Sequence, residues 1–297
     1  MKKVICVNRR PKSGAWGGGN QFLKHFYLVA RAQGYVVQNG LTKDVSTIFI
    51  MDPRPAHGEL DIGQMVEFKQ THPHVRLVHR VNECNLKRDP IIEVDQLLRL
   101  TSKYTDKTVF VSDWMKNYHH RYGWYCKDNT VIHNGVDKEL FCPRTKSESD
   151  VVRIVTHHWS DNKNKSQGYH QWLDEFVGRS RGFSYTFIGR TKDELPNSTV
   201  LSPMSHQDLA KELPKYDVYV NGSAYDPYPN SCLEALACGV PTYTHINGGG
   251  AVEAVGRDHT FSNPEQLEQI LLQKDYLSNN VYLNSWEECI KEYLEIV

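Results

Sequence analysis

Short apolar runs of strand length alternate with amphipathic segments of helix length along this chain of 297 residues. This alternation is typical of parallel sheets covered by helices, because the connection between two parallel strands is long enough to hold a helix. In the first half we expect strands at Val4–Val7, Val45–Met51, Val75–His79, Thr108–Val111 and Val131-Ile132, with a helix at Gln21–Ala32. The first half is therefore predicted to be an α/β domain.

The same alternation restarts after a polar bridge at Pro143–Asp150. Expected strands are Val151–Thr156, Tyr185–Ile188, Asp217–Val220 and Pro241–Thr244, and expected helices are Gly168–Val177, a segment capped at Ser205 that ends at Leu213, Leu233–Cys238 and Trp286–Ile296. We therefore predict two Rossmann-like domains, at residues 1–143 and 151–285. A terminal helix at 286–297 is expected to pack back toward the first domain.

The charge balance and the cysteines exclude several classes of protein. Lys plus Arg number 35 and Asp plus Glu also number 35, so the chain lacks the basic excess of a nucleic-acid binder. No apolar run approaches the roughly 20 residues of a membrane span. Seven cysteines without CxxC spacing argue against a disulfide framework or a zinc knuckle. We expect reduced thiols and a cytoplasmic location.

Three consecutive glycines, Gly17, Gly18 and Gly19, follow the first expected strand. Without Cβ atoms they allow a ligand to approach the backbone closely, and the following helix offers free N–H groups to an anion. The spacing is neither G-x-G-x-x-G nor that of a P-loop. A flexible surface loop is the alternative interpretation.

A second polar group ends the strand at Val75–His79, where Arg80, Asn82 and Glu83 follow. Ligands of open α/β sheets collect at the carboxyl ends of strands. His79 and these three residues are therefore candidates for contact with an acceptor or a sugar. The alternative is an ordinary polar loop.

The stretch from Asp226 to Glu234 places one carboxylate in a loop and another in the first turns of a helix. The backbone amides near the start of this helix can face an anion, and a carboxylate beside them suits a pair of ribose hydroxyls. The candidate substrate-binding residues are Tyr228, Asn230, Ser231, Cys232 and Glu234. Alternatively, Ser231-x-x-Glu234 is a capping box and Glu234 has a structural role.

A basic cluster opens the second half, with Lys163 and Lys165 after an expected strand. A departing diphosphate needs cations whose contact strengthens as its charge develops. A solvated polar loop is the alternative. The adjacent His157 and His158 lack the i, i+4 spacing of a helical metal site, and the chain contains no Asp-x-Asp. We therefore expect neither a metal nor a cofactor.

Together these motifs resemble family 4 retaining glycosyltransferases, which have the GT-B fold of two Rossmann-like domains. The resemblance rests on Asp226-x7-Glu234 with the following Ala-Leu-Ala-Cys-Gly-Val-Pro, and it covers nearly the whole chain. The remaining matches are Gly17–Gly19, Phe110-Val111-Ser112, Val131–Asp137, Phe141-x-Pro143 and Gly248-Gly249-Gly250 with Glu253.

The resemblance implies a role for each matched residue. Glu234 holds the ribose, Asp226 and the neighbouring amides orient the sugar, and Lys165 binds the diphosphate. The chain departs from the family pattern in having Asp226 in place of Glu and Ser160 in place of a common Arg. Arg190 and Lys163 are both candidates for the missing cation.

The implied reaction is transfer of a hexose from a UDP- or GDP-linked sugar to a hydroxyl acceptor, with retention and without metal. The implied partners are the nucleotide-sugar donor and a sugar, glycan or lipid-linked acceptor, and peripheral membrane contact is compatible with the latter. Two alternatives stay open. One is a nucleotide-sugar epimerase on the same fold, and the other is a non-catalytic nucleotide-sugar-binding partner in glycan assembly.

Overall fold

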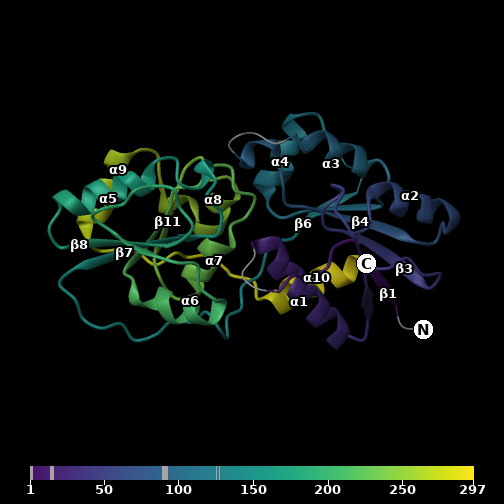
Figure 1. The fold of residues 1–297 in the computed structure, drawn as a ribbon, viewed down its shortest axis with the longest axis horizontal. Coiled ribbons are helices and arrows are strands. Elements are labelled where there is room, and N and C mark those ends of the chain that lie inside the picture. The colour runs from purple at the N-terminus through teal and green to yellow at the C-terminus, as the bar shows by residue number, and fades with distance from the viewer. Residues whose placement is uncertain (1–2, 14–16, 89–92, 125, 127) are drawn as a thin grey trace. The chain divides into compact units, whose positions relative to one another are not determined.

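The computed structural model describes residues 3–13, 17–88, 93–124, 126 and 128–297. The chain folds into two compact units (Figure 1). The first unit comprises Met1–Asn85, Ile92–Gly135 and Asn284–Val297, and the second comprises Leu86–Ile91 and Val136–Leu283. Each unit is built on a parallel sheet with helices, as the alternation in the sequence predicted.

In the described residues of the first unit, six parallel strands run in the order β2-β1-β3-β4-β5-β6. The strands are β1 (Val4–Val7), β2 (Val36–Gln38), β3 (Val45–Ile50), β4 (Arg76–Val81), β5 (Lys107–Phe110) and β6 (Asn129–Val131). The helices are α1 (Gly18–Ala32), α2 (Ile62–Thr71), α3 (Asp95–Ser102), α4 (Asp113–Arg121) and α10 (Trp286–Ile296). A 3-10 turn, η1 (Asn85–Lys87), begins in the first unit at Asn85, and its residues Leu86 and Lys87 belong to the second.

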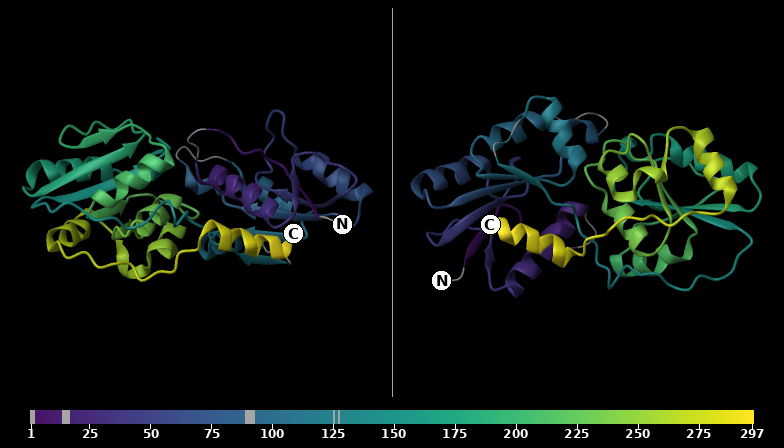
Figure 2. Two further views of the ribbon diagram at one scale, coloured as in Figure 1. Left: turned by 90° about the horizontal axis from the view of Figure 1, so that it is seen from below. Right: turned by 180° about the vertical axis from the view of Figure 1, so that it is seen from behind.

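Successive residues of β1 pack into two different cores, because side chains alternate across a strand. Ile5 and Val7 lie in a cluster with α1 and α10, and Val4 and Cys6 lie in a cluster with α2. The two views of Figure 2 show α1 and α10 side by side against the sheet, and the two helices are in contact. The last segment of the chain thus completes the core of the first unit.

The ends of the two helices on this face have local causes. The capping box of Ser285 with Glu288 starts α10 at Trp286, where the sequence predicted it. In contrast, α1 begins at Gly18, three residues before the predicted start. Gly18 and Gly19 therefore form the first turn of the helix instead of a loop, and Gly17 is its N-cap.

In the described residues of the second unit, six parallel strands run in the order β12-β11-β10-β7-β8-β9. The strands are β7 (Val152–His158), β8 (Phe183–Gly189), β9 (Thr199–Leu201), β10 (Val218–Asn221), β11 (Thr242–His245) and β12 (Thr260–Phe261). The helices are α5 (Tyr169–Arg179), α6 (His206–Glu212), α7 (Asn230–Ala237), α8 (Gly250–Val255) and α9 (Pro264–Gln273), with 3-10 turns η2 (Lys163–Lys165), η3 (Leu213–Lys215) and η4 (Arg257–His259).

The second sheet also has helices on both faces. Leu173 and Phe176 of α5 share a buried cluster with Leu267 and Leu271 of α9, and Figure 1 shows α6 on the opposite side of the sheet. Ser205 caps α6 by accepting the N–H of Asp208, as predicted. None of the described helices in either unit is both long enough and apolar enough to span a bilayer.

Candidate functional site

The structure brings two of the predicted catalytic residues of the second unit together. Lys165 ends the 3-10 turn η2 after β7, and Asp226 follows β10, the neighbouring strand. Their side chains form an ion pair, and Asp226 is buried. Burial by itself raises the pKa of Asp226, but the charges of Lys165 and Lys87 outweigh it and hold that pKa below its usual range. The buried carboxylate therefore stays ionised beside the lysine.

The backbone of Asp226 is held by the glycine segment that precedes α8. The Asp226 N–H donates to the Gly248 carbonyl at 3.1 Å, and the Gly250 N–H donates to the Asp226 carbonyl at 2.8 Å. Gly249 lies between them at a φ of +73°, and a Cβ there would approach the Asp226 carbonyl oxygen to 2.7 Å. Only glycine fits this position, so the glycine segment fixes the loop that carries Asp226.

Tyr225, directly before Asp226, has a φ of +53°. This left-handed conformation is unfavourable for a bulky residue and persists only where surrounding contacts enforce it. One such contact is the hydrogen bond from the Tyr225 N–H to the Asn247 carbonyl at 2.9 Å. Backbone strain and a buried ion pair thus coincide at adjacent positions.

The predicted anion-binding amides differ in their availability. The Tyr228 N–H donates to Oδ1 of Asp226 at 3.2 Å, so in this structure it orients the carboxylate. Asn230 and Ser231 open α7, whose N-cap Pro229 makes no side-chain capping bond. Cys232 is fully buried, and its N–H donates to the Pro229 carbonyl at 3.2 Å, so the structure does not support a ligand contact of this residue. The start of α7 thus offers its helix dipole to an anion beside Asp226.

The capping-box interpretation of Glu234 is wrong. The helix begins at Asn230, one residue before Ser231, and the Glu234 carboxylate contacts two histidines. Its Oε2 lies 2.8 Å from Nε2 of His157, and its Oε1 lies 3.5 Å from Nε2 of His206. Burial by itself raises the pKa of Glu234, but these two histidines lower it to about 2. Glu234 is therefore an ionised carboxylate held by side chains from β7 and α6.

The candidates for a second cation differ in their surroundings. The Arg190 guanidinium, after β8, lies 4.3 Å from the ring centroid of Trp159. Trp159 directly precedes Ser160, the position at which the related motif has Arg. Lys163 is exposed at the start of η2. Arg190 is therefore the candidate that packs next to Ser160, the position at which this chain differs from the related motif.

In the first unit the structure brings Gly19 and Asn82 together. A Cβ on Gly19 would lie 3.6 Å from Nδ2 of Asn82. Gly17 and Gly18 open α1 next to this contact, and no side chain caps the helix. The start of α1 and the end of β4 thus form one polar edge, as expected for the carboxyl ends of parallel strands.

Arg80 and Glu83 are more buried than we expected for residues that contact a substrate. Arg80 is 1% exposed, its guanidinium lies 4.3 Å from the ring centroid of Phe22, and its Nη2 donates to Oδ1 of Asn134 at 2.7 Å. Glu83 is buried, with its Oε2 3.6 Å from Nη2 of Arg54. A contact between Arg80 and a substrate stays a prediction. The burial of Arg80 among core side chains does not support it.

Sequence reasoning missed three residues at these sites. His157 and His206 were not linked to Glu234, and Arg54 was not considered as a partner of Glu83. His157 lies at the carboxyl end of a predicted strand, and this position was a usable signal. His206 and Arg54 carry no such signal, because only the folded chain brings them to their carboxylates.

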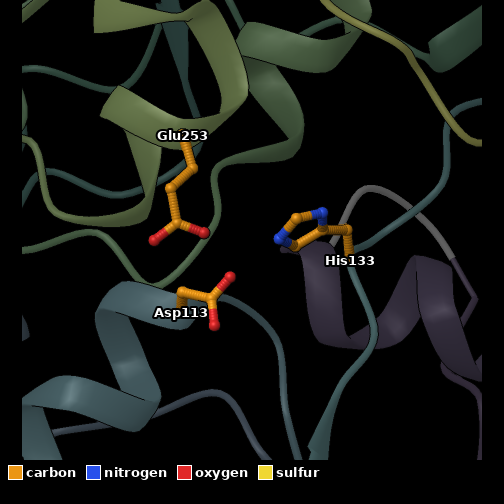
Figure 3. Close-up of side chains that lie close together, drawn as sticks. All are labelled: Asp113, His133 and Glu253. Carbon is orange, nitrogen blue, oxygen red and sulfur yellow. The ribbon is translucent and has the colours of Figure 1, made fainter.

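Three further potential metal ligands are shown in Figure 3. Asp113 begins α4 and His133 follows β6 in the first unit, and Glu253 lies in α8 of the second unit. Within either unit by itself, the described residues contain no group of three such ligands. The expectation of a metal-free site stays a prediction.

Comparison with known sequences gives one informative relative. No protein-family model matches the chain. A probable sucrose-phosphate synthase from Thermosipho melanesiensis is 27% identical over 197 residues, which is 56% of this chain and 46% of the relative. The chain thus matches less than half the length of that curated relative.

Comparison with solved structures concerns the fold. A sucrose-phosphate synthase from Thermosynechococcus elongatus superposes with a TM-score of 0.69 at 14% identity, over 99% of this chain and 94% of that one. Alr3699/HepE from Anabaena in complex with UDP-glucose gives 0.70 at 15% identity over the whole of both chains. A glycosyltransferase from Rickettsia africae gives 0.71 at 13% identity, over 99% and 97%. The chain has the GT-B fold of these structures, as the sequence predicted.

Proposed function

We propose that this chain is a retaining glycosyltransferase that moves a hexose from a nucleotide sugar to a hydroxyl acceptor without a metal. The observation that carries the proposal is the ion pair of Lys165 with the buried Asp226 in the loop that leads to α7. A cation, an ionised carboxylate and a helix N-terminus in one unit suit a sugar diphosphate. The likeness in fold to Alr3699/HepE with UDP-glucose supports UDP-glucose as the first donor to test.

In the proposed reaction the acceptor oxygen forms a bond to the anomeric carbon as the bond from that carbon to the diphosphate breaks. The diphosphate oxygen takes the electron pair of the breaking bond and accepts the proton of the acceptor hydroxyl. Lys165 stabilises the negative charge that develops on this oxygen. Asp226 accepts hydrogen bonds from the hexose, and Glu234 accepts them from the ribose.

A second cation is proposed at Arg190, which reaches the segment before Ser160 by stacking on Trp159. The guanidinium keeps its charge at all working pH values and bonds phosphate through two N–H groups. Trp159 follows β7 and Arg190 follows the neighbouring strand β8, so the contact brings the guanidinium to the connection between β7 and α5 that also carries Lys165. The first unit is proposed to take the acceptor at the edge of Gly19 and Asn82.

The test is calorimetric titration of the chain with UDP-glucose and a panel of other UDP- and GDP-sugars, followed by product analysis. We expect saturable binding of one class of donor, and slow hydrolysis of that donor without an acceptor. Binding without any turnover supports the non-catalytic alternative, and a change of sugar configuration without transfer supports an epimerase. Absence of binding for every donor contradicts the proposal.

A further inference from the structure

Glu234 is held by two imidazoles that come from two other elements of the second unit. His157 lies near the end of β7, and His206 is the first residue of α6. The Nε2 atom of His157 lies 2.8 Å from Oε2 of Glu234, and the Nε2 atom of His206 lies 3.5 Å from Oε1. Each oxygen of the carboxylate thus has its own nitrogen neighbour.

The number of acceptor sites on this carboxylate matches two further donors. An ionised carboxylate has about four lone-pair sites, two on each oxygen. His157 occupies one of them at hydrogen-bond distance, and His206 contacts the other oxygen at ion-pair distance. Among the contacts of the described residues each oxygen thus keeps a site for a donor, and a ribose presents two adjacent hydroxyls. Contacts on both oxygens also stop the carboxylate from rotating, so the remaining sites point in fixed directions.

The two histidines are themselves fixed by contacts that do not involve Glu234. The Tyr219 hydroxyl donates to the His157 carbonyl at 2.9 Å and accepts the His157 N–H at 3.3 Å. The His206 ring packs edge-on against Phe141, with centroids 6.1 Å apart, and Ser205 caps the helix that starts at His206. The imidazoles are therefore placed by the fold, and the flexible glutamate adapts to them.

We propose that His157 and His206 are positioning residues that hold the Glu234 carboxylate ready for the ribose hydroxyls of the donor. This inference rests on the proposed function, in which Glu234 binds the ribose. Neither histidine is required to touch the substrate. Their effect is specific to nucleotides that carry both ribose hydroxyls, because a ligand without one of them cannot use both oxygens.

The test compares the dissociation constants of UDP and 2′-deoxy-UDP by calorimetry, with GDP and 2′-deoxy-GDP in their place where GDP binds more tightly. For the unmodified chain we expect a preference for the ribonucleotide of roughly 10- to 100-fold, typical of one hydrogen bond to a charged group. Glu234→Ala should abolish the preference. His157→Ala and His206→Ala should each reduce it severalfold, because they weaken UDP, which contacts Glu234 through two hydroxyls, more than 2′-deoxy-UDP, which keeps only the 3′-hydroxyl.

Three further variants keep the result interpretable. His157→Gln keeps an N–H donor near the position of Nε2 and should restore part of the preference. His157→Phe keeps the buried volume without a donor, and it replaces the alanine variant where that variant does not fold. His259→Ala is the matched control, because His259 is buried in the same unit and pairs with the Leu277 carbonyl at 3.0 Å. It should leave the preference unchanged.

The two proposals fail in different ways. A preference that survives Glu234→Ala removes the ribose role of Glu234 and with it this part of the proposed function. A preference that disappears with Glu234→Ala but stays intact in folded variants of His157 and His206 overturns the positioning role alone. Equal weakening of UDP and 2′-deoxy-UDP in the histidine variants also overturns it, since a purely structural role predicts that result.

Discussion

Lys165 and Lys163 lie at the two ends of the same 3-10 turn, yet their surroundings differ. Lys165 pairs with the buried Asp226. Lys163 is exposed and, in the described part of the chain, has no ion-pair partner. Two lysines of the same loop therefore allow an internally controlled test of the phosphate-binding role.

Lys165→Ala should lower kcat more than it raises the donor KM, because its charge meets a negative charge that develops in the transition state. We expect a loss in rate on the order of 10²–10³, measured by steady-state kinetics with the identified donor. Lys165→Arg should recover part of the activity, because the charge stays although its geometry changes.

Lys163→Ala is the matched control and should change kcat little. Equal and small effects at the two positions contradict the assignment of the phosphate site. A large effect at Lys163 alone moves that site by two residues along the turn and leaves the fold unchanged.

The ionised state of Glu234 makes a second prediction at the residue scale. Its folded-state pKa of about 2 lies below the ordinary value of 4.5, so its ionisation stabilises the fold above pH 4.5. This stabilisation, roughly 3 kcal/mol, is lost as the pH falls from 4.5 toward 2. Glu234→Gln cannot titrate, so its deficit in unfolding free energy should shrink as the pH falls below 4.5.

Urea unfolding of both proteins from pH 7 down to pH 3 measures this difference. The neighbouring titratable groups are His157 and His206, with Cys232 and Tyr219 close by. For His157→Ala and His206→Ala, the deficit in unfolding free energy relative to the unmodified chain should also shrink below pH 4.5, but by less than for Glu234→Gln. A deficit that instead grows below pH 4.5 contradicts the ionised, histidine-held carboxylate.

At the scale of elements, the glycine segment before α8 decides where Asp226 lies. Gly249→Ala places a Cβ 2.7 Å from the Asp226 carbonyl and forces a non-glycine residue into a φ of +73°. We expect a loss of unfolding free energy of roughly 1–3 kcal/mol from the backbone conformation, together with a higher donor KM. Urea unfolding and steady-state kinetics measure the two effects.

Gly58→Ala is the control for backbone strain alone. Gly58 has a φ of +72°, and an added Cβ meets nothing within 4 Å. It belongs to the first unit, whereas Asp226 belongs to the second. Gly58→Ala should lower the free energy of unfolding without changing the donor KM. Equal changes in donor KM for Gly58→Ala and Gly249→Ala would contradict the role of the glycine segment in holding Asp226.

At the scale of the whole molecule, α10 ends the chain but belongs to the first unit. Ile290 of α10 is fully buried in the cluster with α1 and β3. Ile290→Ala should destabilise this unit by about 2–5 kcal/mol. Hydrogen exchange read by mass spectrometry should show faster exchange in β1, β3 and α1, with nucleotide binding by the second unit retained.

Leu28→Ala is the matched control for Ile290, since Leu28 lies in the same unit but is 66% exposed. It should change exchange little. Faster exchange in β7 and β8 after Ile290→Ala, to the same extent as in β1, contradicts two separately packed units.

Metal independence is also a prediction for the whole protein. The sequence contains no Asp-x-Asp, and the proposed leaving-group stabilisation relies on Lys165 and the helix N-terminus. Donor turnover should therefore persist in excess EDTA. Complete loss that magnesium restores overturns the metal-free mechanism.

The elements that sequence reasoning placed well have local causes. The start of α10 follows from the capping box of Ser285 with Glu288, and β1 matches its four-residue apolar run. The three-residue strand β2 was missed because so short a run carries little periodicity. The early start of α1 was missed because glycines weaken a helix, and here the packing of the helix on the sheet outweighs that propensity.

The sequence alone determined the parallel α/β class and predicted the residues of the candidate site, because strand periodicity and motif spacing are local properties. Lys165, Asp226 and Glu234 were all identifiable from their motifs. Only the tertiary structure decided their partners. The pairing of Glu234 with His157 joins residues 77 positions apart, and that of Lys165 with Asp226 joins residues 61 apart. Such contacts depend on strand order and helix placement, which arise from burial of the whole core and leave no local pattern in the chain.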